Sequence, residues 1–215
     1  MKSGSDIVQL LEGKHLLIFD FDGTVADTMP LHAAAFAQVL APLGITVDYL
    51  SIAGLKTLDA MHQCLAGAGR SLPDTEMAIL VSAKQQCVRD MIAQGLRPLP
   101  GVDEFLRWAR SRYTLAMVTS GSRATVSLAL EKLGYTGWFG PLVYADDVSH
   151  AKPDPEGYMK VLQITGAPAA TALVFEDSNA GVEAARAANL DVIDIRTTTW
   201  QGIGKKPLLL CVNNS

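Results

Sequence analysis

Apolar runs that end in acids or hydroxyls recur along the chain and predict the strands of a sheet. Residues 16–19 read Leu-Leu-Ile-Phe and are followed by Asp20, which is typical of a strand buried on both faces. Similar runs follow at residues 115–118, 172–175 and 192–195, with a weaker one at 142–145. Helical periodicity lies between them, at residues 102–110, 124–133, 155–165 and 178–188. This alternation predicts an α/β fold, a parallel sheet with helices on both faces.

A segment from about Thr28 to Arg97 has a different pattern. It contains helical periodicity only, at residues 31–40, 57–65 and 74–92, and prolines mark both of its edges. We therefore expect residues 28–97 to form an all-helical cap domain inserted into a core made of residues 1–27 and 98–215. The apolar stretch at residues 208–212 is expected to add a last edge strand.

Composition narrows the class of protein. Hydrophobic residues make up 49% of the 215 residues and charged residues 19%, which excludes a disordered or fibrous chain. The chain has 18 basic and 22 acidic residues, and the basic residues form no cluster in the sequence. We therefore expect no nucleic-acid partner. No apolar run reaches the roughly 20 residues that span a bilayer, and the N-terminus does not resemble a signal peptide. Three widely separated cysteines favour reduced thiols in a cytoplasmic protein.

The candidate chemistry stands at the ends of the predicted strands. Ligands bind outside the carboxyl ends of parallel strands. The residues found there are Asp20, Asp22 and Gly23 after the first strand, Thr119, Ser120 and Gly121 after the second, and Glu176, Asp177 and Ser178 after a later one, with Lys152 in a loop. Each of these alone is an ordinary turn, cap or surface residue. Together, however, the carboxylates would repel one another without a cation. Oxygen ligands suit Mg²⁺, and a lysine beside them suits a phosphate.

These motifs resemble those of the haloacid dehalogenase superfamily of phosphohydrolases. The four family motifs occur in order, as residues 20–24, Ser120, Lys152 and residues 176–177, and the resemblance covers nearly the whole chain. Within the superfamily, the chain is similar to the helical-cap subfamily that includes β-phosphoglucomutase and sugar-phosphate phosphatases. The resemblance implies a Rossmann-like core with an inserted helical cap.

The resemblance also implies roles for the core residues. Asp20 would be the nucleophile that forms an aspartyl-phosphate, and Asp22 would be the general acid and base. Ser120 would hydrogen-bond a phosphoryl oxygen, and Lys152 would neutralise charge on the phosphate and on Asp20. Mg²⁺ would be held by Asp20, the backbone carbonyl of Asp22 and Asp177, with Glu176 as a ligand or close behind.

The cap residues are expected to contact the substrate. His32 lies twelve residues after Asp20, where the β-phosphoglucomutase group has a histidine near the reacting groups. Thr57 stands where that group has an arginine that grips a second phosphate, and the adjacent Lys56 is a possible substitute. Lys84 is a further candidate contact. Thr119 and Gly121, beside Ser120, complete the predicted substrate-binding set.

Loss of the arginine favours simple hydrolysis over the mutase reaction. The leading hypothesis is therefore a Mg²⁺-dependent phosphatase, and a sugar-phosphate mutase is its main alternative. A receiver-type signalling module would lack the cap and the second acid at Asp22, and a true carbon–halogen hydrolase would need no metal. No Gly-x-Gly-x-x-Gly turn follows the first strand, which argues against a dinucleotide enzyme.

A helical lid restricts the substrate to a small phosphorylated metabolite, such as fructose 1-phosphate or phosphoglycolate. The sequence does not choose among such esters. We expect the protein to be a monomer or a weak homo-oligomer.

Overall fold

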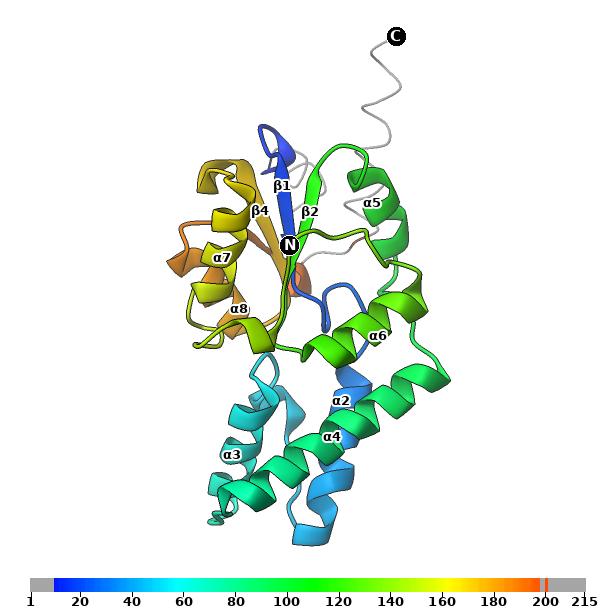
Figure 1. Ribbon diagram of the computed structural model, residues 1–215, viewed down its shortest axis with the longest axis vertical. Helices are drawn as coiled ribbons and strands as arrows, with labels where there is room; N and C mark the ends of the chain where they lie inside the picture. The colour runs from blue at the N-terminus through cyan, green and yellow to red at the C-terminus, as the bar shows by residue number, and fades with distance from the viewer. Residues whose placement is uncertain (1–9, 198–199, 201–215) are drawn as a thin grey trace.

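The computed structural model describes residues 10–197 and residue 200, and within this part a five-stranded parallel sheet forms the core (Figure 1). Its strand order is β3-β2-β1-β4-β5. The strands are β1 (Leu16–Phe19), β2 (Thr114–Val118), β3 (Leu142–Val143), β4 (Ala172–Glu176) and β5 (Asp191–Asp194). In register, Leu17 of β1 lies between Leu115 of β2 and Leu173 of β4. The prediction of a Rossmann-like parallel sheet is confirmed.

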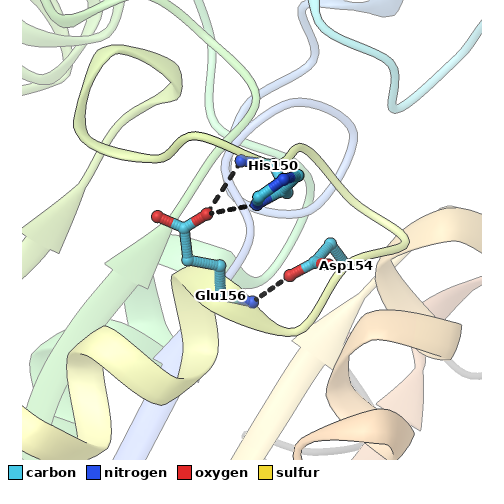
Figure 2. A group of neighbouring side chains, drawn as sticks. All are labelled: His150, Asp154 and Glu156. Carbon is cyan, nitrogen blue, oxygen red and sulfur yellow. Dashed lines mark hydrogen bonds and ion pairs between the residues drawn. The ribbon is translucent and has the colours of Figure 1, made fainter.

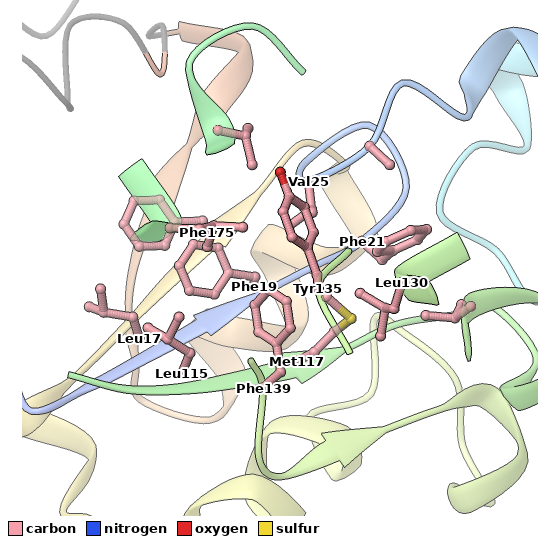
Figure 3. Packing of buried hydrophobic residues seen from close by; sticks show 14 of the residues in the cluster. Leu17, Phe19, Phe21, Val25, Leu115, Met117, Leu130, Tyr135, Phe139 and Phe175 are labelled. Carbon is pink, nitrogen blue, oxygen red and sulfur yellow. The ribbon is translucent and has the colours of Figure 1, made fainter. Parts of the chain in front are cut away.

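Helices cover both faces of the sheet because successive strand residues point to opposite sides. Leu17 and Phe19 of β1 face α5 (Val102–Ala109) and α6 (Arg123–Leu133). Leu16 and Ile18 face α7 (Glu156–Thr165) and α8 (Asn179–Ala187). The first face is rich in aromatic rings, and the rings of Phe19 and Phe175 stack with centroids 4.9 Å apart (Figure 3).

The predicted elements match the observed ones closely, with small differences at their ends. Residues 142–145 were expected to be one strand, but β3 stops at Val143, and Ala145–Asp147 forms a 3-10 helix. An Asp147 carboxylate oxygen accepts the backbone N–H of Tyr144, which favours that turn over a longer strand. The strand expected at residues 208–212 lies outside the described residues.

Three long helices follow β1 and lie beyond the carboxyl ends of the strands, as Figure 1 shows. They are α2 (Met29–Leu40), α3 (Thr57–Gly67) and α4 (Asp74–Gln94), with short 3-10 helices at Ala41–Leu43 and Tyr49–Ser51. They share an apolar cluster of their own, which contains Phe36, Leu40, Met61 and Leu65. Val88 and Ile92 of α4 instead pack into the apolar cluster on the sheet face that α5 and α6 cover. Because Met77 of α4 belongs to the cluster of the three helices, α4 contacts both the sheet core and the helical segment.

None of the helices among the described residues is both long and apolar enough to cross a bilayer.

Candidate active site

The residues predicted at the strand ends meet at one edge of the sheet. The Nζ atom of Lys152 lies 2.6 Å from Oδ1 of Asp20, 2.6 Å from Oε1 of Glu176 and 3.0 Å from the Val118 carbonyl oxygen. Asp20 follows β1, Glu176 ends β4, and Lys152 comes from the loop before α7. All three side chains are buried, so the ammonium is enclosed by oxygen acceptors.

Glu176 is fully buried, and both of its oxygens have protein partners. Oε1 accepts from Lys152 and from the Tyr158 hydroxyl at 3.0 Å. Oε2 accepts the backbone N–H of Asp177 and both the N–H and the hydroxyl of Ser178, at 3.0–3.1 Å. These bonds stabilise the buried charge and fix the chain that carries Asp177. Glu176 therefore fixes the position of the Lys152 amine and of the chain at Asp177 and Ser178 through these hydrogen bonds.

Oxygen atoms of Asp20, Glu176 and Asp177 lie within 4.8 Å of one another. Burial raises the pKa of Asp20 well above its usual range, and the neighbouring carboxylates add to this against the attraction of Lys152. Burial, followed by the charge of Glu176, raises the pKa of Asp177 to about 7. A divalent cation would relieve this repulsion, and an all-oxygen donor set fits Mg²⁺. These residues therefore fit the predicted metal.

A glycine is required where the chain turns back after β1. Gly23 has a φ of +77°, and a Cβ atom at this position would lie 2.1 Å from Oδ2 of Asp177. A side chain would thus displace the Asp177 carboxylate. The turn brings Asp20, Asp22 and Asp177 to the same cavity, which they line together.

Asp22 is directed toward the helical segment. Its Oδ1 accepts the hydroxyl hydrogen bond of Thr28 at 2.6 Å and lies 3.3 Å from Nε2 of His32, without hydrogen-bond geometry. Burial alone would raise the pKa of Asp22. The nearby His32, the Thr28 hydrogen bond and the positive charge of Lys84 outweigh it and lower this pKa to about 2.

Lys84 on α4 is almost completely buried and has no carboxylate within ion-pair distance in the described part of the chain. Its Nζ atom lies 2.8 Å from Nδ1 of His32 and 4.5 Å from the centre of the Phe36 ring. Burial lowers the pKa of Lys84 to about 8, although Asp22 opposes this. An ammonium group can only donate, so Nδ1 of His32 is the acceptor of this hydrogen bond.

Of the three predicted residues after β2, two line the active-site cavity and one does not. Ser120 and Gly121 line the cavity, and the Ser120 hydroxyl donates to the Gly54 carbonyl oxygen at 2.8 Å. Thr119 is buried away from this cavity, and its hydroxyl accepts the Gly121 N–H at 2.9 Å. Thr119 therefore shapes the loop that presents Ser120.

Lys56 and Thr57, the two predicted substrate contacts at the start of α3, point to different places. Thr57 lines the cavity. Lys56 does not, because its amine donates to the Val148 carbonyl oxygen of the core at 2.9 Å. This placement does not support Lys56 as a ligand of a second phosphate.

Sequence reasoning missed several residues of this site. Thr28 bonds Asp22, Tyr158 bonds Glu176, and Tyr49 and Gln85 line the cavity. The position of Tyr158, six residues after Lys152 on a helix that faces the sheet, was a usable signal. Tyr49 and Gln85 lie on helical segments and Thr28 directly precedes α2, and the sequence pattern leaves the orientation of these segments open.

A second cluster of ionisable side chains lies beside the Lys152 loop and contains His150, Asp154 and Glu156 (Figure 2). Glu156 accepts the backbone N–H groups of Ser149 and His150 at 2.8–3.0 Å, and Asp154 accepts the N–H of Glu156 at 2.9 Å. The Lys160 hydrogen bond, followed by these backbone N–H groups, lowers the pKa of Glu156 to about 2. The carboxylates of this cluster thus hold the loop that carries Lys152.

Comparison with known proteins agrees with this geometry. Residues 17–195 match the model of the haloacid dehalogenase-like hydrolase family, and the chain belongs to this family of enzymes. It is 34% identical to the fructose-1-phosphate phosphatase YqaB of Escherichia coli (strain K12) over 180 residues, which cover 84% of this chain and 95% of that protein. It is 38% identical to the protein CbbY of Rhodobacter capsulatus over 191 residues, which cover 82% of this chain and 83% of that protein.

Among solved structures, the chain resembles CbbY from Rhodobacter sphaeroides in complex with phosphate. The TM-score is 0.74 at 26% identity, over 83% of this chain and 84% of the other. The expected family and fold are therefore confirmed.

Proposed function

We propose that the protein is a Mg²⁺-dependent phosphatase that hydrolyses a small phosphate monoester through an aspartyl-phosphate on Asp20. The observation that carries this proposal is the enclosure of the Lys152 ammonium by Asp20 and Glu176, each at 2.6 Å, beside the Asp177 carboxylate. A buried nucleophilic carboxylate, a fixed cation and a metal-binding acid are the groups that phosphoryl transfer needs.

Each core residue has one task in this proposal. An Asp20 oxygen attacks phosphorus, and the ester oxygen leaves with the proton that Asp22 supplies. Asp22 then takes a proton from the water that hydrolyses the aspartyl-phosphate. Its pKa of about 2 before the substrate binds leaves the carboxylate ionised, the form that can accept a proton in the second step. For the first step, the approaching phosphoryl anion raises this pKa, since a like charge disfavours the ionised carboxylate.

Lys152 neutralises the phosphoryl charge, and Ser120 exchanges its bond to the Gly54 carbonyl for one to a phosphoryl oxygen. Mg²⁺ would be held by Asp20, Asp177 and the Asp22 carbonyl, with Glu176 behind them, and would supply further stabilisation of the negative charge in transfer.

We also propose that residues 28–97 act as the cap domain over a core of residues 1–27 and 98–215. The cavity encloses about 40 Å³ of free space, room for roughly three water molecules. We propose that the cap moves away from the core to admit the ester. Relatives named as a fructose-1-phosphate phosphatase and as phosphoglycolate phosphatases support a small phosphate ester as the substrate. Thr57 in place of an arginine and the bond of Lys56 to the core support one phosphate per substrate, with Lys84 as the cap cation of the lining.

A panel of small phosphate esters tests the proposal, with release of inorganic phosphate measured in the presence and absence of Mg²⁺. We expect Mg²⁺-dependent hydrolysis of sugar phosphates that needs no bisphosphate activator. A requirement for a sugar bisphosphate would instead support the mutase alternative. Absence of phosphate release from every ester would contradict the proposed function.

A further inference from the structure

Tyr49 lies in the active-site cavity but has no role in the chemistry described above. It begins the 3-10 helix Tyr49–Ser51, which follows α2 in the cap, and it lines the same cavity as Asp20, Asp22 and Asp177. Its ring packs against two rings of α2, with centroids 6.4 Å from His32 and 6.2 Å from Phe36. Phe36 is buried, so this packing restricts the orientation of the Tyr49 ring.

The Tyr49 hydroxyl has no hydrogen-bond partner among the described residues, although the side chain is half-buried. By contrast, the hydroxyls of Tyr135 and Tyr158 bond to Asp103 and Glu176. The Tyr49 hydroxyl is therefore available to a ligand in the cavity. Burial and then the charge of Asp22 raise the pKa of Tyr49, so its hydroxyl keeps its proton and remains a donor.

The cap side of the cavity otherwise offers few free polar groups. The Lys84 amine lines the cavity and directs one of its three N–H donors to His32, and Phe36 and Ile52 are apolar. Neutral donors and acceptors remain on Tyr49, Thr57 and Gln85. Such groups suit the hydroxyls of a neutral leaving group better than they suit a second anion.

We propose that Tyr49 is a specificity-determining residue, whose hydroxyl hydrogen-bonds a hydroxyl of the leaving group when the cap closes. This inference rests on the proposed phosphatase function. Because Tyr49 is part of the cap and the nucleophile Asp20 is part of the core, the contact forms only when the cap closes over the ester. An ester without leaving-group hydroxyls makes no such contact and gains nothing from Tyr49.

The test compares the wild type and Tyr49→Phe on two substrates. One is the best sugar phosphate in the panel, beginning with fructose 1-phosphate, and the other is phenyl phosphate, whose leaving group carries no further hydroxyl. The variant is expected to lower kcat/KM about fivefold for the sugar phosphate, since one hydrogen bond contributes about 1 kcal/mol, and less than about 2-fold for phenyl phosphate. Tyr135→Phe is the matched control, since it removes a hydroxyl bonded to Asp103, outside the cavity.

The outcomes separate the two proposals. Equal loss on both substrates, or no loss on the sugar phosphate, would overturn the role of Tyr49 while leaving the phosphatase intact. The same holds if the wild type hydrolyses phenyl phosphate but no sugar phosphate. A wild type that hydrolyses no ester of the panel would refute the proposed function, and the inference with it. Circular dichroism of Tyr49→Phe confirms that the variant is folded.

Discussion

The ammonium of Lys152 lies 2.6 Å from the Asp20 carboxylate, although 131 residues of chain separate them, as their numbers in the sequence show. The contact depends on two parallel strands and on the loop before α7, and Glu176 supports it at the same distance from the other side. Burial on its own would lower the pKa of Lys152, but Asp20 and Glu176 outweigh it and raise that pKa well above its ordinary value. The site therefore holds a permanent positive charge where the phosphate is proposed to bind.

Replacing Lys152 by Met is expected to damage both stability and catalysis. It leaves Asp20 and Glu176 buried without their cation, which costs about 3–5 kcal/mol of unfolding free energy. The loss of its charge from the phosphate site is expected to lower kcat by about 10²–10³-fold. Denaturant unfolding and steady-state kinetics measure the two effects. Near-wild-type kcat in a folded variant would contradict the role given to Lys152.

Asp20→Asn separates catalysis from folding. The amide is nearly isosteric and its oxygen still accepts from Lys152, but it is too poor a nucleophile to form the covalent intermediate. We expect turnover below detection. Removing one of three clustered carboxylates also reduces their repulsion, so the thermal midpoint of the metal-free variant is expected to equal or exceed that of the wild type. Retention of more than about a tenth of the activity would refute Asp20 as the nucleophile.

The strands and the core residues of the site could be predicted from the sequence because the sheet itself brings the motifs together. Apolar runs at β1, β2 and β4 identified buried parallel strands, and parallel strands end at one edge, so Asp20, Ser120 and Asp177 were predicted to lie close together. The sequence pattern carries no comparable rule for the cap. Lys56 and Thr57 are neighbours at the start of α3, and only packing decides that Thr57 lines the cavity while Lys56 reaches Val148.

Removal of Mg²⁺ is expected to abolish activity and to make stability depend on pH through Asp177. The metal-free pKa of Asp177 is about 7, above its unfolded value of 3.8. A raised carboxyl pKa favours the folded state below about pH 4, and this contribution is lost as the pH rises toward and through 7. Mg²⁺ needs the ionised carboxylate, so its affinity should fall as the pH drops below 7.

Calorimetric titration of Mg²⁺ between pH 5.5 and 8, together with thermal unfolding in chelator, measures both trends. Asp177→Asn should weaken Mg²⁺ binding and remove the part of the pH dependence that Asp177 contributes. Mg²⁺ affinity that is unchanged in Asp177→Asn would contradict the assignment of Asp177 as a ligand.

Lys84 predicts an alkaline limit to activity. Its pKa of about 8 means that the ammonium loses its proton above that pH, and the positive charge that helps to lower the Asp22 pKa is then lost. We expect kcat/KM to decline above pH 8 in the wild type. In Lys84→Met the activity should be lower at neutral pH, and this alkaline decline should be absent. An identical pH profile in the two proteins would show that another group controls the alkaline limb.

The last prediction concerns how the cap is held closed. Two hydrogen bonds join the Gly54–Lys56 loop to the core, from Ser120 to the Gly54 carbonyl and from Lys56 to the Val148 carbonyl. Gly54 allows the loop to approach this closely, since its φ is +85° and a Cβ atom there would lie 2.8 Å from Ser178. Substrate binding is proposed to replace the Ser120 bond, so Lys56 becomes the contact that persists when the ester is enclosed.

Lys56→Met is therefore expected to shift the cap toward the open state. The loss of about 1 kcal/mol corresponds to a roughly fivefold decrease in kcat/KM for every small ester, whatever its leaving group. This uniform decrease distinguishes Lys56 from Tyr49, whose effect depends on leaving-group hydroxyls. Lys132→Met removes the same charge from an exposed position of α6, outside the Gly54–Lys56 loop, and serves as the control. Hydrogen exchange in residues 54–56 should increase only in Lys56→Met. Unchanged exchange with unchanged kcat/KM would show that the Lys56–Val148 hydrogen bond does not hold the cap closed.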